Sequence, residues 1–492
     1  MRRILDLTAL CALATIGCRS DLGPSPVSVQ RPGVSGEVNV VDFGASGHDE
    51  TDDTHEIEAA MASLPPTGGT VFIPRGTYFL TAAHTNPHRA LDLTGAHNVV
   101  LRGEGAPHTI LRMAPGTYPG SVSTIWIENA SGISISDLTI DGNRSEVSYG
   151  DEQSHTLSIV SSIGIAVDRV AFVNSGGDGI RLLGAPVAGA PWTEKVSIAN
   201  SSFSDMWRNG VSIQRAVREV VIDANAFNLV SDQAISSEPS GEGGPVDIVV
   251  EDNVITHSTG NWAVALAGIN SADGLKQVVF RRNRIEDGAV YFLQARDLTI
   301  ESNTIIGDTR HAALRLHDVT AASVSSNLIN GSSKNEGVLQ VVNDGNNMSS
   351  DVTIDGNTIK VGPEMTGIYV RDASGGIRIL GNTIQSANGA RGIQVESVLE
   401  TGLPRSDFTV EDNVIDNFKY GILFSTRGDL FSGIEIKRNE IDHDQSPPTN
   451  AVGIALGGIP VSDAIEMISN VFGTGVTSVL CMISSDVSCD RG

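Results

Sequence analysis

The chain has 492 residues with 58 acidic and 33 basic side chains, which give a formal net charge of −25. This excess of negative charge argues against nucleic acid, and against an anionic membrane surface, as a main partner. Aromatic residues make up only 5% of the composition, which argues against a broad aromatic platform for stacking sugars.

The N-terminal segment has the pattern of a targeting signal followed by a tether. The apolar stretch at residues 7–16 follows a basic start and is too short to cross a bilayer, which predicts a secretory signal over residues 1–18. The phrase that ends at Cys18 resembles the lipobox of bacterial lipoproteins, although Thr15 stands where that family usually has Leu. The protein is therefore expected to be secreted or to be an outer-surface lipoprotein of a bacterium, with a lipid on Cys18 as its only membrane contact. Residues 19–36, rich in Ser, Pro, Gly and Val, predict a flexible tether.

Residues 37–80 have the pattern of a cap over the end of a solenoid. Thr51-Asp-Asp offers N-cap side chains, and the apolar spacing that follows predicts a short amphipathic helix ending at Pro65. Residues 68–78, Gly-Gly-Thr-Val-Phe-Ile-Pro-Arg-Gly-Thr-Tyr, predict a strand, a turn and a second strand. A helix over the open end of a stack of strands would cover an otherwise sticky sheet edge.

From about residue 195 to the C-terminus the chain repeats one phrase, in which two alternating apolar residues are followed by a short gap, an Asn and another apolar residue. Looser copies stand upstream, so the solenoid is expected over residues 81–480. These Asn residues run from Asn225 to Asn470 in steps of 28, 30, 20, 24, 30, 25, 31, 26 and 31 residues. A second period-two phrase in each repeat, such as Gly392-Ile-Gln-Val, again indicates strands and not helices. The pattern predicts an all-β parallel β-helix solenoid of about 12 turns. Each Asn is expected at a sharp turn, where it tolerates left-handed backbone geometry and its amide stacks into a ladder.

Residues 481–492 are expected to form a C-terminal tail. Cys481 and Cys489 are the two cysteines outside the targeting segment. They predict one disulfide in an oxidising compartment. No Cys/His spacing typical of a metal site is present in the sequence.

Two phrases of the cap, at residues 38–54 and 68–78, closely resemble the N-terminal cap of the pectate-lyase superfamily. The family pattern is roughly Val-x-x-Phe-Gly-Ala-x-Gly-Asp-Gly-x-x-Asp-Asp-Thr, followed by Gly-Gly-x-Val-x-x-Pro-x-Gly-x-Tyr. This chain departs from it at His48-Asp-Glu, where the family has Asp-Gly. The resemblance implies a right-handed parallel β-helix and a protein that acts on acidic polysaccharide as a lyase, a polygalacturonase or a uronan epimerase.

The catalytic motifs of these families are mostly absent from the solenoid. Polygalacturonases carry Asn-Thr-Asp, an Asp-Asp pair in mid-helix, Gly-His-Gly and Arg-Ile-Lys, and none of these stands in this core. The Asp-Pro-His-Glu motif of alginate epimerases is also missing. A lyase-type enzyme is the favoured hypothesis, whereas a glycoside hydrolase of polygalacturonase type and a non-catalytic carbohydrate-binding or adhesive surface protein are the alternatives.

The best candidate site comes from stacking the early repeats on one another. Aligning Ile180, Val211 and Ile235, with a looser match at Leu157, collects an imidazole, several carboxylates and two guanidiniums on one flank of about four turns. The expected catalytic residues are His155, Asp178, Arg181, Asp205, Arg208, Asp232 and Glu238. The expected substrate-binding residues are Trp207, Asn209, Gln214 and Trp262.

This mixture of side chains suits chemistry on uronates. Arg181 or Arg208 is suited to bind a uronate carboxylate bidentately, and His155 is suited to act as base or acid near neutral pH. The carboxylates are suited either to hold Ca²⁺ or to act as the pair of a hydrolase, so a possible Ca²⁺ cofactor stays open and no metal ligands are assigned. The two tryptophans suit either sugar stacking or packing. The oligomeric state is open.

Overall fold

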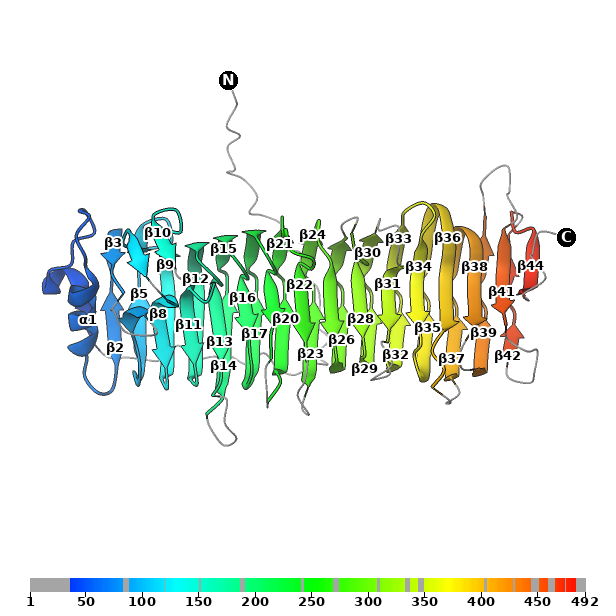
Figure 1. Ribbon diagram of the computed structural model, residues 1–492, viewed down its shortest axis with the longest axis horizontal. Coiled ribbons are helices and arrows are strands. Elements are labelled where there is room, and N and C mark those ends of the chain that lie inside the picture. The colour runs from blue at the N-terminus through cyan, green and yellow to red at the C-terminus, as the bar shows by residue number, and fades with distance from the viewer. Residues whose placement is uncertain are drawn as a thin grey trace, which may run out of the picture.

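The computed structural model describes residues 36–82, 88–118, 120–149, 152–185, 191–239, 243–268, 274–307, 310–331, 337–343, 349–401, 405–427, 430–443, 451–458, 465–473 and 475–483. They form one long rod in which short strands stack along the axis (Figure 1). All strands of the described residues pair in parallel. The predicted parallel β-helix is therefore confirmed.

Each full turn contributes a strand to three parallel sheets that run the length of the rod. Sheet 1 consists of β1 (Glu37–Asn39), β2 (Gly69–Phe72), β5 (Val99–Arg102), β9 (Ser131–Asp141), β12 (Ile163–Ser175), β14 (Thr193–Ala199), β17 (Val217–Asp223), β20 (Val246–Glu251), β23 (Leu275–Arg281), β26 (Ala295–Glu301), β29 (Thr320–Ser325), β32 (Ser350–Asp355), β35 (Gly375–Leu380), β37 (Arg405–Glu411), β39 (Phe431–Lys437) and β42 (Ile465–Ile468). Sheet 2 consists of β3 (Gly76–Leu80), β6 (Thr109–Met113), the ends of β9 and β12, β15 (Ser202–Met206), β18 (Ala226–Val230), β21 (Val254–Thr256), β24 (Arg284–Glu286), β27 (Thr304–Ile306), β30 (Leu328–Gly331), β33 (Thr358–Val361), β36 (Thr383–Ser397), β38 (Val414–Thr426), β40 (Glu440–Asp442) and β43 (Val471–Phe472). Sheet 3 consists of β4 (His88–Asp92), β8 (Val122–Glu128), β11 (His155–Val160), β13 (Ile180–Leu183), β16 (Val211–Ile213), β19 (Ile235–Ser237), β22 (Val264–Ala267), β25 (Val290–Leu293), β28 (Leu314–His317), β31 (Gly337–Val342), β34 (Thr366–Arg371), the ends of β36 and β38, β41 (Val452–Gly457) and β44 (Ser478–Ile483). A small separate pair is formed by β7 (Gly116–Tyr118) and β10 (Val147–Tyr149).

The core of the rod is built by the inward-facing residue of every second position. On sheet 1, for example, Val220 stacks in register on Ile248 and Ile222 stacks on Val250, and all four are fully buried. Elsewhere in the core Phe203 stacks between two neighbouring phenylalanine rings, at centroid distances of 4.6 and 4.8 Å. Identical alternation in successive turns thus produces one continuous apolar column.

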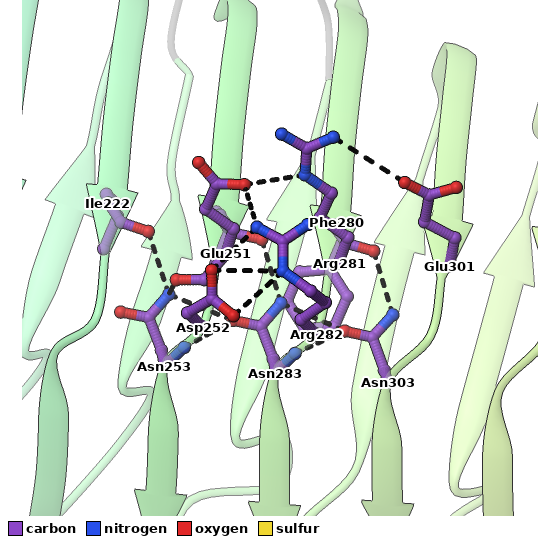
Figure 2. A network of polar contacts seen from close by, with 11 residues as sticks. Ile222, Glu251, Asp252, Asn253, Phe280, Arg281, Arg282, Asn283, Glu301 and Asn303 are labelled. Carbon is purple, nitrogen blue, oxygen red and sulfur yellow. Dashed lines mark hydrogen bonds and ion pairs between the residues drawn. The ribbon is translucent and has the colours of Figure 1, made fainter. Parts of the chain in front are cut away.

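The repeated asparagines form the expected ladder inside the rod. Figure 2 shows Asn253, Asn283 and Asn303 in line, where the backbone N–H and Nδ2 of each donate to Oδ1 of the next at 2.9 to 3.1 Å. The left-handed residue, however, is not the Asn. It is the residue before it, such as Arg282 with φ 54° or Ser302 with φ 56°. The Asn is therefore selected for its amide hydrogen bonds, while its predecessor makes the sharp turn.

Charged side chains outside this ladder pair between turns. Figure 2 also shows Glu251 accepting hydrogen bonds from Arg281 and Arg282, both at 2.6 Å. Arg282 in addition bonds Asp252 at 2.7 to 3.2 Å. This network neutralises part of the surface charge between neighbouring turns. Glu251 and Asp252 therefore have partners within the protein, and their presence does not require a bound ligand.

The cap has the predicted helix and strand pair. The 3-10 helix η1 (Val40–Phe43) and the helix α1 (Thr54–Ala62) lie at the N-terminal end of the rod (Figure 1). Asp53 occupies the N-cap position but does not cap α1, since its Oδ1 accepts from the Ser46 N–H at 2.6 Å. Asp52 instead provides the hydrogen bonds at the start of the helix. Its Oδ1 accepts from the N–H and the hydroxyl of Thr54 and from the N–H of Thr81.

Replacing Asp52 by Ala is therefore expected to destabilise α1 by about 1 kcal/mol, which is typical for the loss of a side-chain cap. Amide hydrogen exchange of α1 measures this local opening free energy directly. Glu50→Ala is the matched control, because this neighbouring carboxylate is exposed and makes no such hydrogen bonds. Equal exchange rates in both variants would contradict the capping role of Asp52.

Several predicted features lie outside the described residues. They are the signal at residues 1–18 with Cys18, the tether up to residue 35, and Cys489 of the expected disulfide. No helix among the described residues is long and apolar enough to cross a membrane.

Candidate functional site

Sheet 3 brings three of the predicted residues, together with Gln233, into one column. Its registers pair Leu157 with Ile180, Ile180 with Val211 and Val211 with Ile235, which is the alignment expected from the sequence. The positions two residues before these inward-facing side chains are His155, Asp178, Asn209 and Gln233. Side chains from four successive turns are therefore neighbours in space.

His155 and Asp178 form a pair that is shut off from solvent. Both side chains have 0% exposure, and His155 Nδ1 lies 3.2 Å from Asp178 Oδ2. The backbone N–H of Asp178 donates to the same Nδ1 at 3.0 Å. Burial, and then the charges of Arg181 and Arg208, lower the pKa of His155 well below its ordinary value, so the ring is neutral. Because Nδ1 accepts a hydrogen bond, the proton of the neutral ring is on Nε2, and His155 offers a donor there rather than a base.

Asn209 binds the other carboxylate oxygen of Asp178. Its backbone N–H and its Nδ2 donate to Asp178 Oδ1 at 3.1 and 3.0 Å. Burial nevertheless raises the pKa of Asp178 to about 7, although Arg208 and the hydrogen bonds from Asn209 oppose this. Asp178 therefore changes its charge near neutral pH, where a solvated Asp is always ionised.

Arg208 and Glu238 lie on the partly exposed side of this pair. Arg208 Nη2 donates to Glu238 Oε1 and Oε2 at 2.9 and 3.0 Å. Arg208 Nη1 lies 3.7 Å from Asp178 Oδ2, and Asn209 Nδ2 donates to Glu238 Oε1 at 3.3 Å. The Glu238 side chain is 37% exposed and that of Arg208 is 13% exposed. One guanidinium thus connects a buried carboxyl to a solvent-facing carboxylate.

Arg181 and Ser212 complete this group from outward positions on β13 and β16. The two residues are in register on neighbouring strands. Ser212 is completely buried, and burial lowers the pKa of the Arg181 guanidinium while Asp178 opposes that shift. We refer to His155, Asp178, Arg181, Arg208, Asn209, Ser212 and Glu238 as the polar cluster.

The polar cluster contains buried atoms that have no hydrogen-bond partner among the described residues. They are His155 Nε2, Asp178 Oδ2, Arg181 Nε, Arg208 Nη1 and Ser212 Oγ. The His155 and arginine nitrogens can only donate, and the Ser212 hydroxyl can donate as well. Buried donors in proteins are nearly always satisfied. Their concentration here therefore points to an acceptor such as a carboxylate as the ligand of this site.

Asp232 and Gln214 lie beside the polar cluster. Asp232 accepts a hydrogen bond from Gln233 Nε2 at 2.8 Å, and burial, followed by the charge of Glu238, raises its pKa. Gln214 follows the last residue of β16, and its backbone N–H donates to the Leu182 carbonyl. No hydrogen bond joins the Gln214 side chain to the described part of the cluster.

Asp205 and Trp207 belong to a different contact. Asp205 forms an ion pair with Arg144, whose guanidinium lies 5.3 Å from the ring centre of Trp207. Trp207 is 55% exposed. The structure thus brings these two predicted residues together with Arg144 and not with the polar cluster, because Asp205 lies on β15 of sheet 2.

Trp126 is a neighbour of the site to which sequence reasoning gave no role. It pairs with Ser158 in register on β8 and β11, which places it in the same outward column as Arg181. The Arg181 guanidinium lies 5.6 Å from its ring centre, and that of Arg89 lies at 4.2 Å. The alternation within β8, where Ile125 points inward, was the signal that would have revealed it.

The described residues contain no group of three or more His, Cys, Asp or Glu side chains that is suited to hold a metal ion. In the polar cluster the carboxyl groups of Asp178 and Glu238 face Asn209, His155 and Arg208 instead. The site geometry therefore assigns no residue to Ca²⁺.

Comparison with known families identifies the class of this protein. A family model described as right handed beta helix region matches residues 123–287, 193–349 and 288–459, which together are more than half of the chain. The protein therefore belongs to the right-handed β-helix family. A second model, rhamnogalacturonase A/epimerase, pectate lyase-like, matches residues 37–105. The resemblance to the pectate-lyase superfamily is thereby confirmed.

Individual relatives match only in part. The mannuronan C5-epimerase AlgE3 of Azotobacter vinelandii is 37% identical over 116 residues, which are 23% of this chain and 6% of that protein. Alginate lyase 7 of the same organism is 38% identical over 112 residues, 22% of this chain and 13% of that protein. This chain thus matches only a small part of the length of these relatives. The tailspike protein of E. coli bacteriophage HK620, solved with a pentasaccharide, is 14% identical with a TM-score of 0.53, covers 88% of this chain and 80% of its own, and is similar in fold alone.

Proposed function

We propose that this protein is an enzyme that acts on an acidic polysaccharide, with lyase-type chemistry at a uronate bound over the polar cluster. The observation that carries the proposal is the set of unpartnered buried donors beside two guanidiniums. A uronate carboxylate offers the acceptor atoms and the negative charge that these donors lack. The names of the relatives, mannuronan C5-epimerase and alginate lyase, support this class of substrate.

In the proposed reaction the side chains of the polar cluster have different roles. Arg181 and Arg208 neutralise the uronate carboxylate, which acidifies the proton on the neighbouring carbon, C5. Glu238, the solvent-facing carboxylate of the cluster, removes that proton. The electron pair forms a C4=C5 double bond, the C4–O4 bond breaks, and the released oxygen takes a proton from water. Epimerisation shares the first step but returns a proton to C5, and the names of six relatives favour it as the second candidate.

The test is incubation of the protein with alginate, pectate and rhamnogalacturonan fragments in heavy water, followed by mass spectrometry. Unsaturated fragments without added water are the expected products. Deuterium uptake at C5 without cleavage would show that the activity is that of an epimerase and not of a lyase. Fragments with added water, or no mass change on any substrate, would contradict proton abstraction and favour the hydrolase or the binding protein, respectively.

The affinity for the acidic substrate is expected to fall as the pH rises through about 7. Asp178 with its raised pKa is protonated below that value, so the positive charges of Arg181 and Arg208 outweigh the charge of Glu238. Above it, ionised Asp178 cancels one of these charges and weakens the attraction for a uronate. His155 stays neutral throughout and does not contribute. Isothermal titration calorimetry with an acidic oligosaccharide at pH 6 and at about pH 8 measures the change.

Asp178→Asn is the matched variant for this pH dependence, because the amide has the shape of the protonated acid but cannot ionise. We expect its affinity at pH 8 to equal that of the unmodified protein at about pH 6. An equally steep decline in Asp178→Asn would assign the pH dependence to another group.

We also propose that the protein works outside the cytoplasm, secreted or anchored through Cys18. Cys18→Ala should then move it from the membrane fraction to the medium, whereas an unchanged distribution would favour simple secretion. The possible Ca²⁺ cofactor is tested in the same assays by adding EDTA, and a loss of turnover that Ca²⁺ restores would establish it.

A further inference from the structure

Beyond the polar cluster, sheet 3 continues in the same register through β22, β25 and β28. Ile235 pairs with Val264, Val264 with Val290, and Val290 with Leu314. Trp262 therefore occupies the column position of His155 and Asp178. The residues Tyr291 and Arg315 stand in the outward column of Arg181, and His317 stands in that of Glu238. The next turns thus present aromatic and basic groups where the earlier turns present the polar cluster.

These side chains support one another. The ring of Trp262 stacks on Tyr291 at a centroid distance of 4.6 Å and on His311 at 4.8 Å. The hydroxyl of Tyr291 is 2.8 Å from Nδ1 of His317, and the Arg315 guanidinium lies 5.9 Å from the Tyr291 ring centre. All five side chains are partly exposed. The rings are therefore held in place before any ligand binds, which lowers the entropy cost of binding.

The residues between the two groups are small. The outward positions of β22 are Ala265 and Ala267, and Ala265 lies in register between Ser236 on one side and Tyr291 on the other. At the usual strand spacing of roughly 4.8 Å, Ser236 and Tyr291 are about 10 Å apart along the axis of the rod. A sugar chain that crosses the strands can therefore reach from the polar cluster to the rings without meeting a large side chain on β22.

We propose that Trp262, Tyr291, His311, Arg315 and His317 form a ring platform, a second binding site for further sugar units of the same acidic polysaccharide. Aromatic rings with one apolar body and a polar tip suit the apolar faces of pyranose rings, and Arg315 supplies charge for their carboxylates. The acidic nature of the ligand rests on the proposed function, but the ring platform itself rests on the stacked rings and their register. The low content of aromatic residues argues against a broad aromatic surface, whereas the ring platform is a local group of side chains.

The test compares a uronate dimer with a uronate octamer, because only the longer chain spans both sites. Affinities are measured by calorimetry in the Glu238→Gln background, so that the ligand is not consumed. Trp262→Ala should weaken binding of the octamer about tenfold and leave the dimer unchanged. Tyr291→Leu is a second variant with the same expectation, in case one of the two does not fold. Trp192→Ala, just before β14 of sheet 1, is the matched control and should change neither affinity.

The outcomes separate this inference from the proposed function. Octamer binding that depends on Trp262, combined with no turnover by the unmodified protein, would overturn the proposed enzyme and leave the ring platform standing. Turnover together with octamer affinity that Trp262→Ala and Tyr291→Leu do not change would overturn the ring platform alone. Equal weakening of dimer and octamer would also overturn it, because the rings would then belong to the first site.

Discussion

Replacing Arg208 by Ala should lower kcat/KM on the acidic substrate by about 100- to 1000-fold, the usual effect of removing one preorganised charge-stabilising donor. The reason is its position between the two carboxyl groups of the site. Its guanidinium binds Glu238 at 2.9 Å and lies 3.7 Å from Asp178. Without Arg208 the substrate carboxylate loses a positively charged partner. The pKa of Asp178, which burial already raises, then rises further, because Arg208 is the main group that lowers it. Initial rates on a defined oligosaccharide, with product masses, measure the loss.

The matched control for this variant is Arg144→Ala. Arg144 also pairs with a carboxylate and lies over an aromatic ring, but those partners are Asp205 and Trp207, outside the polar cluster. We expect kcat/KM to change less than about threefold in Arg144→Ala, since exposed ion pairs contribute little. Arg208→Lys keeps the charge but not the forked geometry of the guanidinium, so its kcat/KM should lie between those of Arg208→Ala and Arg144→Ala. Near-normal turnover in Arg208→Ala, with the fold intact by circular dichroism, would place the reaction elsewhere on the rod.

The agreement between the sequence-based site and the structure follows from register. Once the period of the strands is known, the residues two positions before each inward side chain must stack, so the neighbourhood of Asp178 and Asn209 was predictable. Residues of a neighbouring sheet do not share this column, and the repeat alone does not show to which sheet Asp205 belongs. Asp205 lies on β15 of sheet 2, where it forms an ion pair with Arg144 instead of joining the cluster.

Burial and hydrogen-bond direction were not predictable from the same pattern. Nothing in the local sequence shows that the backbone N–H of Asp178 occupies Nδ1 of His155, yet this single bond decides that the ring donates from Nε2. The cap gives a similar case. Asp52 and Asp53 are equivalent N-cap candidates by type, and only the distant contacts with Thr81 and Ser46 decide that Asp52 bonds the helix start.

Removing one rung of the asparagine ladder should cost the rod about 2–4 kcal/mol of unfolding free energy, because it leaves several buried groups without partners. Asn327 is buried in the middle of the ladder. Its Oδ1 accepts from the N–H and Nδ2 of Asn303, both at 2.9 Å, and its Nδ2 donates to the Ile300 carbonyl at 3.0 Å and to Asn357 Oδ1 at 2.9 Å. Asn327→Ala removes all of these bonds, and urea denaturation measures the cost.

Asn330→Ala is the matched control for this prediction. Asn330 lies three residues further along the same turn, but its side chain points to solvent, so its loss should change stability by less than about 0.5 kcal/mol. Asn327→Asp keeps the acceptor and loses the donors, and it should cost at least as much as Asn327→Ala because it also buries a charge. If Asn327→Ala were no worse than Asn330→Ala, the apolar columns alone would hold the turns together. The Asn repeat would then reflect only the turn that its left-handed predecessor Ser326 makes.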